Sequence, residues 1–230
     1  MILDRLARVL VLLLARRRPP AAAARALLGL EAFLRVQLDR TATAYEGGEH
    51  VKHRLMRYHD FFVERIGGSE RVLDVGCGKA ELARDIAERS GARVTGIDFD
   101  EGYLAFARRR DLPERLELEL ADALDYRPAE SFDVVVLSNV LEHIEERPAL
   151  LRALHERTGA RRFLIRVPVF ERDWIVPLRK ELGLPYFSDL THFTEYVPGQ
   201  LEQELREAGL ELVEQQARWG ELWAEARVPQ

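Results

Sequence analysis

The sequence is poor in cysteine and has no long uninterrupted apolar stretch. Among its 230 residues, Cys77 is the single cysteine, so neither an intramolecular disulfide nor a cysteine-based zinc cluster can form. The apolar run from Val9 to Ala15 is too short to span a bilayer and ends at three arginines. A signal peptide would have its positive charges first and a small-residue cleavage site after the apolar run, and neither condition is met cleanly. These absences favour a globular chain in a reducing cytoplasm.

The first forty residues carry a net positive charge, whereas the rest of the chain is net acidic. Residues 1–40 carry eight arginines against three acids, a net charge of +5, whereas the whole chain carries −5. The remainder is therefore −10. A net-acidic body argues against a broad nucleic-acid surface, because phosphate contacts need clustered cations, and we expect no nucleic-acid partner.

The basic N-terminal segment is expected to form two helices, separated by Pro19-Pro20, with the second over Ala21 to Leu38. We treat residues 1–45 as a helical appendage and residues 46–230 as the main domain. Two interpretations of residues 1–18 stay open. They pack on the domain or in a homodimer, or they make a weak contact with an anionic membrane surface. Packing is favoured, because apolar helices are more often buried in protein.

The stretch from Val72 to Ala83 predicts a buried strand, a glycine turn and the start of a helix. Gly76 and Gly78 let the backbone approach a ligand, and the helix directs its free N–H groups toward it. A dinucleotide site would need a third glycine where Glu81 stands. Asp74 would also repel a pyrophosphate, but it suits a ligand that carries an ammonium group.

On Asp74, Gly76 and Gly78 the chain resembles the class I S-adenosylmethionine (SAM)-dependent methyltransferases, whose motif is D/E-x-G-x-G-x-G; Ala80 replaces the last glycine. The resemblance continues through Val94 to Asp98, Ala121-Asp122-Ala123 and the strand Phe132 to Ser138. It implies that Asp74 and the glycine loop hold the methionine end of SAM, Asp98 the ribose and Asp122 the adenine, with the backbone N–H of Cys77 meeting the cofactor. The residues expected to contact SAM are Asp74, Gly76, Cys77, Gly78, Asp98, Phe99, Asp122, Ala123 and Asn139.

The resemblance also implies the fold class. We expect an α/β, Rossmann-like, doubly wound sheet of about seven strands, mostly parallel with an antiparallel edge, plus the N-terminal helices. The alternation in Leu116 to Leu120 predicts a half-buried strand. A helix over Gly199 to Glu207 and two strands near 210–215 and 218–224 would complete the methyltransferase domain, 46–230.

Two further segments are expected to border the acceptor. Residues 50–66 are predicted to form one helix that closes over SAM, with an apolar stripe at helical spacing: Val51, Leu55, Tyr58, Phe62 and Ile66. Residues 168–199 form an insertion that we expect to be a rigid loop and to set the substrate, because it mixes aromatic and polar residues with four prolines. This insertion resembles that of methyltransferases from bacterial surface-glycan or secondary-metabolite pathways.

Asn139 and Glu142 are expected to form a capping box at the start of a helix. His143, which follows, is a candidate general base, and His192 in the insertion is the second. Some related RNA and quinone-precursor methyltransferases hold a divalent ion here with E-x-x-E-H and a downstream histidine. Because Asn139 replaces the first glutamate, we predict no metal site, although that alternative stays open.

The predicted activity is transfer of a methyl group from SAM to a hydroxyl of a small molecule or glycan precursor, with an amine as the less favoured acceptor. Two alternatives from other classes stay open. One is an NAD-dependent oxidoreductase, because an acid about twenty residues after the glycines also suits NAD. The other is a non-catalytic, SAM-binding partner subunit.

Overall fold

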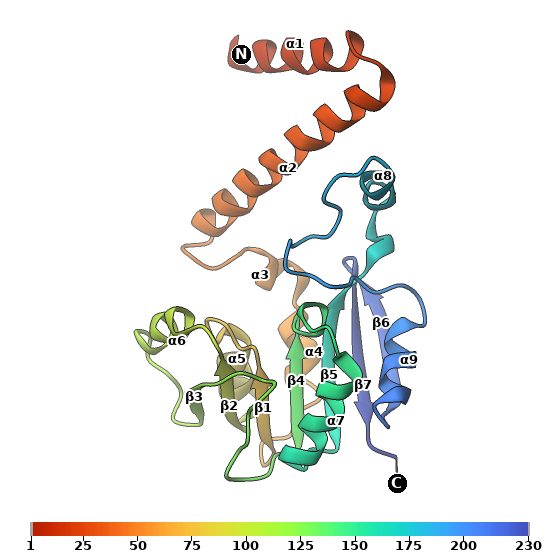
Figure 1. Cartoon of the computed structure of the whole chain (residues 1–230). Coiled ribbons are helices and arrows are strands. Elements are labelled where there is room, and N and C mark those ends of the chain that lie inside the picture. The colour runs from red at the N-terminus through yellow and green to blue at the C-terminus, as the bar shows by residue number, and fades with distance from the viewer. Residues whose placement is uncertain (1, 230) are drawn as a thin grey trace. The chain divides into compact units, whose positions relative to one another are not determined.

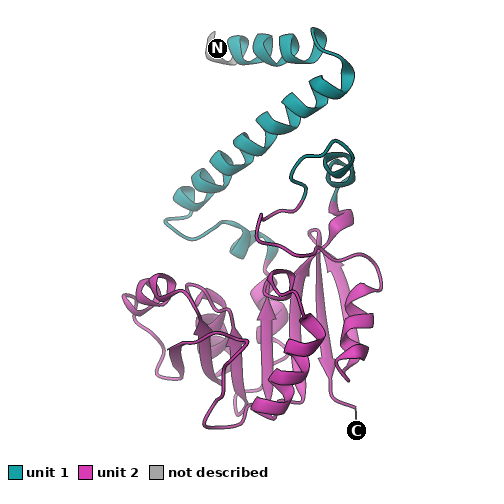
Figure 2. Cartoon of the chain, in the orientation of Figure 1, with its two compact units in different colours: residues 1–56, 173–186 teal, residues 57–172, 187–230 magenta. Residues whose placement is uncertain are grey.

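The computed structural model describes residues 2–229, with side chains from Arg5 onward. Met1, in the predicted appendage, and Gln230, at the end of the predicted methyltransferase domain, lie outside the described residues. The chain divides into two compact units, residues 1–56 with 173–186 and residues 57–172 with 187–230 (Figure 2). The unit boundary therefore lies at Met56, and the proposed domain limit at residue 45 stays a prediction.

The described residues of the first unit form helices joined by turns and loops, with no strand among them. Its elements are α1 (Ile2–Arg16), α2 (Pro20–Tyr45), α3 (Lys52–Met56) and α8 (Ile175–Glu181). Pro20 occupies the first turn of α2, where the missing N–H costs nothing. Part of the insertion, expected to be loop, is thus a helix held to α2. Arg179 donates to the Leu28 carbonyl at 2.8 Å and forms an ion pair with Glu31 at 2.6 Å.

The second unit contains a seven-stranded sheet in the order β3-β2-β1-β4-β5-β7-β6 (Figure 1). The strands from β1 to β5 pair in parallel, and β7 is antiparallel to both β5 and β6. This confirms the predicted Rossmann-like sheet with its antiparallel edge. The strand bounds are β1 (Arg71–Val75), β2 (Arg93–Asp98), β3 (Leu116–Leu120), β4 (Val134–Ser138), β5 (Arg162–Pro168), β6 (Glu211–Arg218) and β7 (Glu221–Arg227).

Helices cover both faces of this sheet. On one face, Leu73 and Phe163 join a buried cluster with Leu151 and Leu205. On the other face, Tyr58 stacks on Arg166. The helices and 3₁₀ turns of the unit are α4 (Tyr58–Val63), α5 (Glu81–Ser90), α6 (Glu101–Arg108), η1 (Leu141–His143), α7 (Arg147–Thr158), η2 (Phe170–Arg172) and α9 (Gln200–Glu207).

The prediction of a single helix over residues 50–66 is wrong. Arg57 adopts a left-handed backbone conformation, with φ of 51°, which separates α3 from α4. A right-handed helix cannot pass through such a residue. The predicted apolar stripe is broken accordingly. Tyr58 and Phe62 are buried, but Leu55 is 58% exposed.

The predicted helix over Gly199 to Glu207 is confirmed as α9, whereas the last strand, predicted at 218–224, spans Glu221–Arg227. Helix α6 ends at Arg108, and Gly91 closes α5 with φ of 78°. Leu116–Leu120 is a strand, although Leu120 is 56% exposed. Across residues 2–229, none of the helices combines the length and apolar character needed to cross a bilayer.

Replacing a core residue of β5 should destabilise the second unit. Phe163 is fully buried between β4 and β7. We expect Phe163→Ala to lower the free energy of unfolding by about 3–5 kcal/mol, because truncation removes buried apolar area and leaves a cavity. Val213→Ala, on the exposed side of β6, is the control and should change it by less than about 0.5 kcal/mol. Equal losses in urea denaturation would contradict this packing.

Candidate functional site

The candidate site lies where the chain reverses direction across the sheet. After β1 the strands proceed to β2 and β3, and the chain then returns to β4 on the other side of β1. Open α/β sheets bind ligands beside the carboxyl ends of the strands at such a switch point. Gly76 follows β1 with φ of 66°, and a Cβ there would lie 2.8 Å from Cγ2 of Val140. The β1 and β4 loops are thus packed too closely for any residue other than glycine.

Asp74 supplies a buried carboxylate without a full set of partners. Its side chain is 2% exposed, and Oδ2 has no hydrogen-bond partner among the described residues. Burial, with a smaller contribution from the nearby Asp98 carboxylate, raises the pKa of Asp74 to about 8. A cationic group would compensate both effects, so the structure favours an ammonium ligand at this position.

The Asp98 side chain stabilises the glycine loop through two hydrogen bonds. Its Oδ2 accepts a hydrogen bond from the Gly78 amide at 2.8 Å, and Oδ1 accepts one from the Asp100 amide at 2.9 Å. Each carboxylate oxygen retains capacity for another donor. The expected contact with a ribose therefore stays a prediction, and the observed contacts tie Asp98 to the shape of the loop.

The expected role of the Cys77 backbone is wrong. Its N–H donates to the carbonyl of Ile97 at 2.9 Å and is not directed to a ligand. The side chain packs against β2, where a Cβ on Gly96 would lie 2.9 Å from the Cys77 sulfur. Burial and the carboxylates of Asp74 and Asp98 raise the pKa of the thiol. The Cys77 side chain is therefore uncharged, and it packs the glycine loop against β2.

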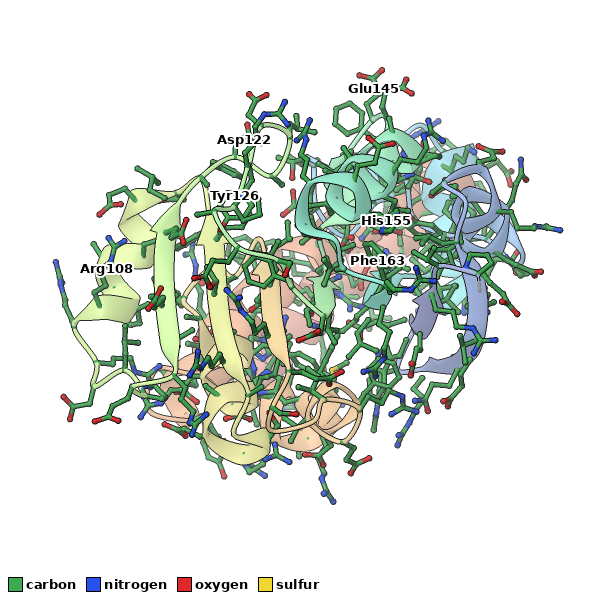
Figure 3. All side chains as sticks on the ribbon, turned by 90° about the horizontal axis from the view of Figure 1, so that it is seen from below. Arg108, Asp122, Tyr126, Glu145, His155 and Phe163 are labelled. Carbon is green, nitrogen blue, oxygen red and sulfur yellow. The ribbon has the colours of Figure 1, made fainter. Side chains whose placement is uncertain are left out.

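The predicted adenine and ribose neighbours lie after β2 and β3. Asp122 is exposed and accepts from the Leu124 amide at 2.9 Å (Figure 3 shows it in the connection after β3). Ala123 is half-buried beside the core, and Phe99 is 80% exposed directly after β2. Their contacts with a cofactor stay predictions.

The predicted capping box after β4 is also wrong. Asn139 has a left-handed backbone with φ of 58°, and its Nδ2 donates to Oε1 of Glu142 at 2.6 Å. A 3₁₀ turn follows, and α7 begins only at Arg147. Glu142 is fully buried, its Oε2 has no partner among the described residues, and burial raises its pKa to about 7. The pair therefore builds a buried polar site and does not cap a helix; cofactor binding by Asn139 stays a prediction.

The two candidate bases, His143 and His192, lie in contact. Their ring centroids are 4.6 Å apart in an edge-to-face arrangement. The amide of Phe193 donates to the Glu142 carbonyl at 2.8 Å, which joins the insertion to the turn after β4. The structure thus brings together two residues that are forty-nine positions apart in the sequence.

The side chains that orient the two histidines were not selected by the sequence analysis: a hydroxyl for His143 and a carboxylate for His192. Thr191 donates its hydroxyl proton to Asp189 at 2.7 Å, and it lies 2.9 Å from Nδ1 of His143. Because that hydroxyl has only one proton, Nδ1 of His143 is the donor in the second contact. His192 Nδ1 lies 3.3 Å from Oε1 of Glu195. In both imidazoles the proton is thus on Nδ1, and Nε2 is left as the nitrogen that can accept a hydrogen bond or a proton.

Glu195 is a buried, ionised anchor for His192. Its side chain has no exposed surface and forms an ion pair with Arg172. The amide and hydroxyl of Ser188 also donate to it. The His192 contact and these donors outweigh burial and lower the pKa of Glu195 to about 2. Its spacing of three residues from His192 was the available sequence signal.

A second missed residue is Arg166, which is buried in β5. It forms a bidentate ion pair with Glu221 at 2.6 and 2.7 Å, and its NH1 donates to Ser138 at 3.2 Å. Its guanidinium lies 3.7 Å from the ring centroid of Tyr58. An arginine within an apolar strand gives little signal in the sequence, because only the register shows that Glu221 lies nearby.

Glu142, His143 and His192 could also hold a cation. One ligand atom from each lies within 4.8 Å of the others. Three donors are few for a hard divalent ion, and Asn139 directs an N–H at Glu142 where the metal-dependent motif has a glutamate. The geometry is thus compatible with the metal-binding alternative that the sequence analysis left open.

Comparison with known proteins settles the family. A family model described as a methyltransferase domain matches residues 48–215. The chain belongs to the class I SAM-dependent methyltransferases. This methyltransferase is 33% identical over 162 residues to the ubiquinone biosynthesis O-methyltransferase of Pseudomonas aeruginosa strain UCBPP-PA14, covering 65% of the chain and 68% of that protein. The corresponding protein of Pseudomonas entomophila is 32% identical with the same coverage.

Solved structures support the fold of the methyltransferase. Magnesium protoporphyrin IX methyltransferase from Synechocystis PCC 6803, with SAH bound, superposes with a TM-score of 0.63 at 18% identity, covering 88% of this chain and 95% of that one. The glycopeptide N-methyltransferase MtfA in complex with SAM gives 0.59 at 19% identity, covering 76% and 87%. At these identities the likeness concerns the fold alone.

The site fits SAM, the cofactor of this family. Asp74 offers a buried carboxylate for the ammonium of the methionine end, and the close β1 and β4 loops leave the backbone of Gly76 accessible beside it. Asp98 holds the loop in place at the end of β2. When bound, SAM supplies a methyl group on a positively charged sulfur. The family assignment argues against the NAD-dependent alternative.

Asp74→Asn should weaken SAH binding and change how stability depends on pH. The folded protein holds a proton on Asp74 up to about pH 8, whereas the unfolded chain loses it near 3.8. This group therefore lowers the free energy of unfolding as pH rises from about 4 to about 8. We expect the variant to gain stability relative to the wild type over that interval in urea denaturation, while calorimetry shows weaker SAH binding.

Asp111→Asn, at an exposed position, serves as the matched control and should alter neither property. If Asp74→Asn bound SAH normally and followed the wild-type pH profile, the buried carboxylate would have no part in holding the cofactor.

Proposed function

We propose that the protein transfers the methyl group of SAM to a hydroxyl of a small molecule, with His192 as the general base. The observation that carries this proposal is the paired arrangement of His192 with the buried Glu195 beside the end of β4. The naming of the relatives as ubiquinone biosynthesis O-methyltransferases supports a hydroxyl acceptor. An amine or a glycan precursor is the less favoured acceptor.

The cofactor end and the acceptor end of the site have different roles in this mechanism. Asp74 and the glycine loop position the cofactor, and positioning of the reacting groups supplies much of the rate in such a displacement. His192 accepts the hydroxyl proton at Nε2, since Nδ1 is directed to Glu195. The ionised Glu195 then stabilises the imidazolium that forms.

His143 is the weaker candidate base. Burial and the neighbouring His192 lower its pKa, and its orienting contact is a neutral hydroxyl. A lower pKa makes an imidazole a poorer proton acceptor near neutral pH. We therefore place His143 beside the acceptor as a hydrogen-bond partner.

Removing the base should reduce turnover without affecting the cofactor. We expect His192→Ala to lower kcat by about 100-fold or more and to leave SAH affinity unchanged. The assay follows methyl transfer by mass spectrometry, with hydroxylated ubiquinone precursors and amine analogues as acceptors. Glu195→Gln should retain the fold but shift the pH profile of kcat, which identifies Glu195 as a positioning residue. His155→Ala, a control in α7, should keep full activity. Full activity in His192→Ala would exclude it as the base.

Chelation tests the metal alternative. If His192 acts as a base without an ion, activity should survive exhaustive treatment with EDTA followed by gel filtration. Because the three candidate ligands include Glu142, whose pKa is about 7, a bound cation would have to compete with a proton. Loss of activity that magnesium restores, more effectively at pH 8 than at pH 6, would assign the cluster to a metal ion. It would contradict the metal-free proposal.

A further inference from the structure

Helix α1 presents an apolar stripe that no other described part of its unit covers. Leu6, Val9, Leu10 and Leu13 follow a spacing of three and four residues, which places them on one side of a helix. Their exposed fractions are 61%, 51%, 57% and 42%. These values would be unusual for a helix that serves only to complete a protein core. Helix α2 buries Ala23 and Leu28 but also exposes Phe33, Leu34 and Leu38, so it is the charge of α1 that sets the two helices apart.

Outside the stripe the same segment carries more positive than negative charge, although the exposed Val11 and Leu12 also lie there. Residues 1–18 contain five arginines and one acid, Asp4, so the segment carries +4. At 100° per residue, Arg5 and Arg16 lie at one edge of the apolar stripe and Arg8 lies on the opposite side of the helix. Arg17 and Arg18 extend the positive charge beyond the helix end. Long arginine side chains at the edge of an apolar face can reach lipid phosphates.

The length of α1 excludes a transmembrane role. Fifteen residues rise about 22 Å as an α-helix, less than the roughly 30 Å of a hydrocarbon core. A helix with one apolar and one cationic side lies in the plane of the membrane interface instead.

Charge decides between a membrane and a second copy of the chain. Two copies of α1 packed through their stripes would bring two sets of arginines together, which is unfavourable. An anionic lipid surface accepts the apolar stripe and the arginines at once. Residues 41–230 carry −10, so the same surface attracts the N-terminal segment and repels the acidic remainder.

We propose that α1 binds the surface of an anionic phospholipid membrane, with Leu6, Val9, Leu10 and Leu13 in the acyl boundary and the arginines against the phosphates. This contact is independent of the methyl-transfer site, which lies in the second unit. It attaches the protein to a lipid surface reversibly, because one short helix buries little apolar area.

Vesicle co-sedimentation of the full chain tests the proposal. The protein should sediment with vesicles of phosphatidylcholine and phosphatidylglycerol, bind poorly to phosphatidylcholine alone, and be released by high salt. The double variant Leu6→Glu, Leu10→Glu should reduce binding by about tenfold or more, since two charges replace the inserted residues. Replacing Arg16, Arg17 and Arg18 by glutamine should remove the preference for anionic vesicles.

Val213→Glu provides a matched control, because it makes the same kind of change at a position 47% exposed on β6. It should bind vesicles as the wild type does, and all variants should bind SAH normally. Wild-type protein that fails to sediment with anionic vesicles, or a double variant that binds as well as the control, would overturn the proposal. So would light scattering that shows a dimer converted to a monomer by the double variant, which would assign the stripe to a second copy.

Discussion

A buried carboxylate, one of whose oxygens has no partner in the part of the chain that the structure describes, dominates the cofactor end of this fold. Asp74 is carried into the sheet by the register of β1, between β2 and β4, and its Oδ2 has no partner among the described residues. The protein bears this cost beside a loop that Asp98 and Cys77 hold rigidly. Such local conflicts with burial rules mark functional sites. The arrangement therefore favours a cationic ligand beside Asp74.

The strands were predictable because each carries its own signal. Val72 to Val75 and Val134 to Leu137 are buried on both sides and apolar except for Asp74, as is typical of parallel strands covered by helices. The break at Arg57 was not predictable in the same way. Apolar residues continue at helical spacing across it, and nothing in the local sequence marks a left-handed residue there. Tyr58, the first residue of α4, stacks on Arg166, a partner that the local sequence does not reveal.

The candidate site shows the same division between local and distant information. Asp74, Gly76 and Gly78 were recognisable because one continuous segment contains the whole pattern. Glu195 and Arg166 were missed because their partners, Arg172 and Glu221, become neighbours only after folding. The expected role of the Cys77 N–H and the capping box at Asn139 were wrong for a related reason. Backbone and side-chain donors in a turn have several acceptors available, and the structure used Ile97 and Glu142.

The surroundings of two buried glutamates beside His192 shift their pKa values in opposite directions. Glu142 receives one hydrogen bond and is otherwise desolvated, so its pKa rises to about 7. Glu195 receives an arginine and two donors from Ser188, so its pKa falls to about 2. Pairs of like groups driven apart in this way separate the roles of acid and base in a site. The imidazole between them therefore has a fixed anion at Nδ1, while the second carboxyl stays free to exchange a proton or accept a cation.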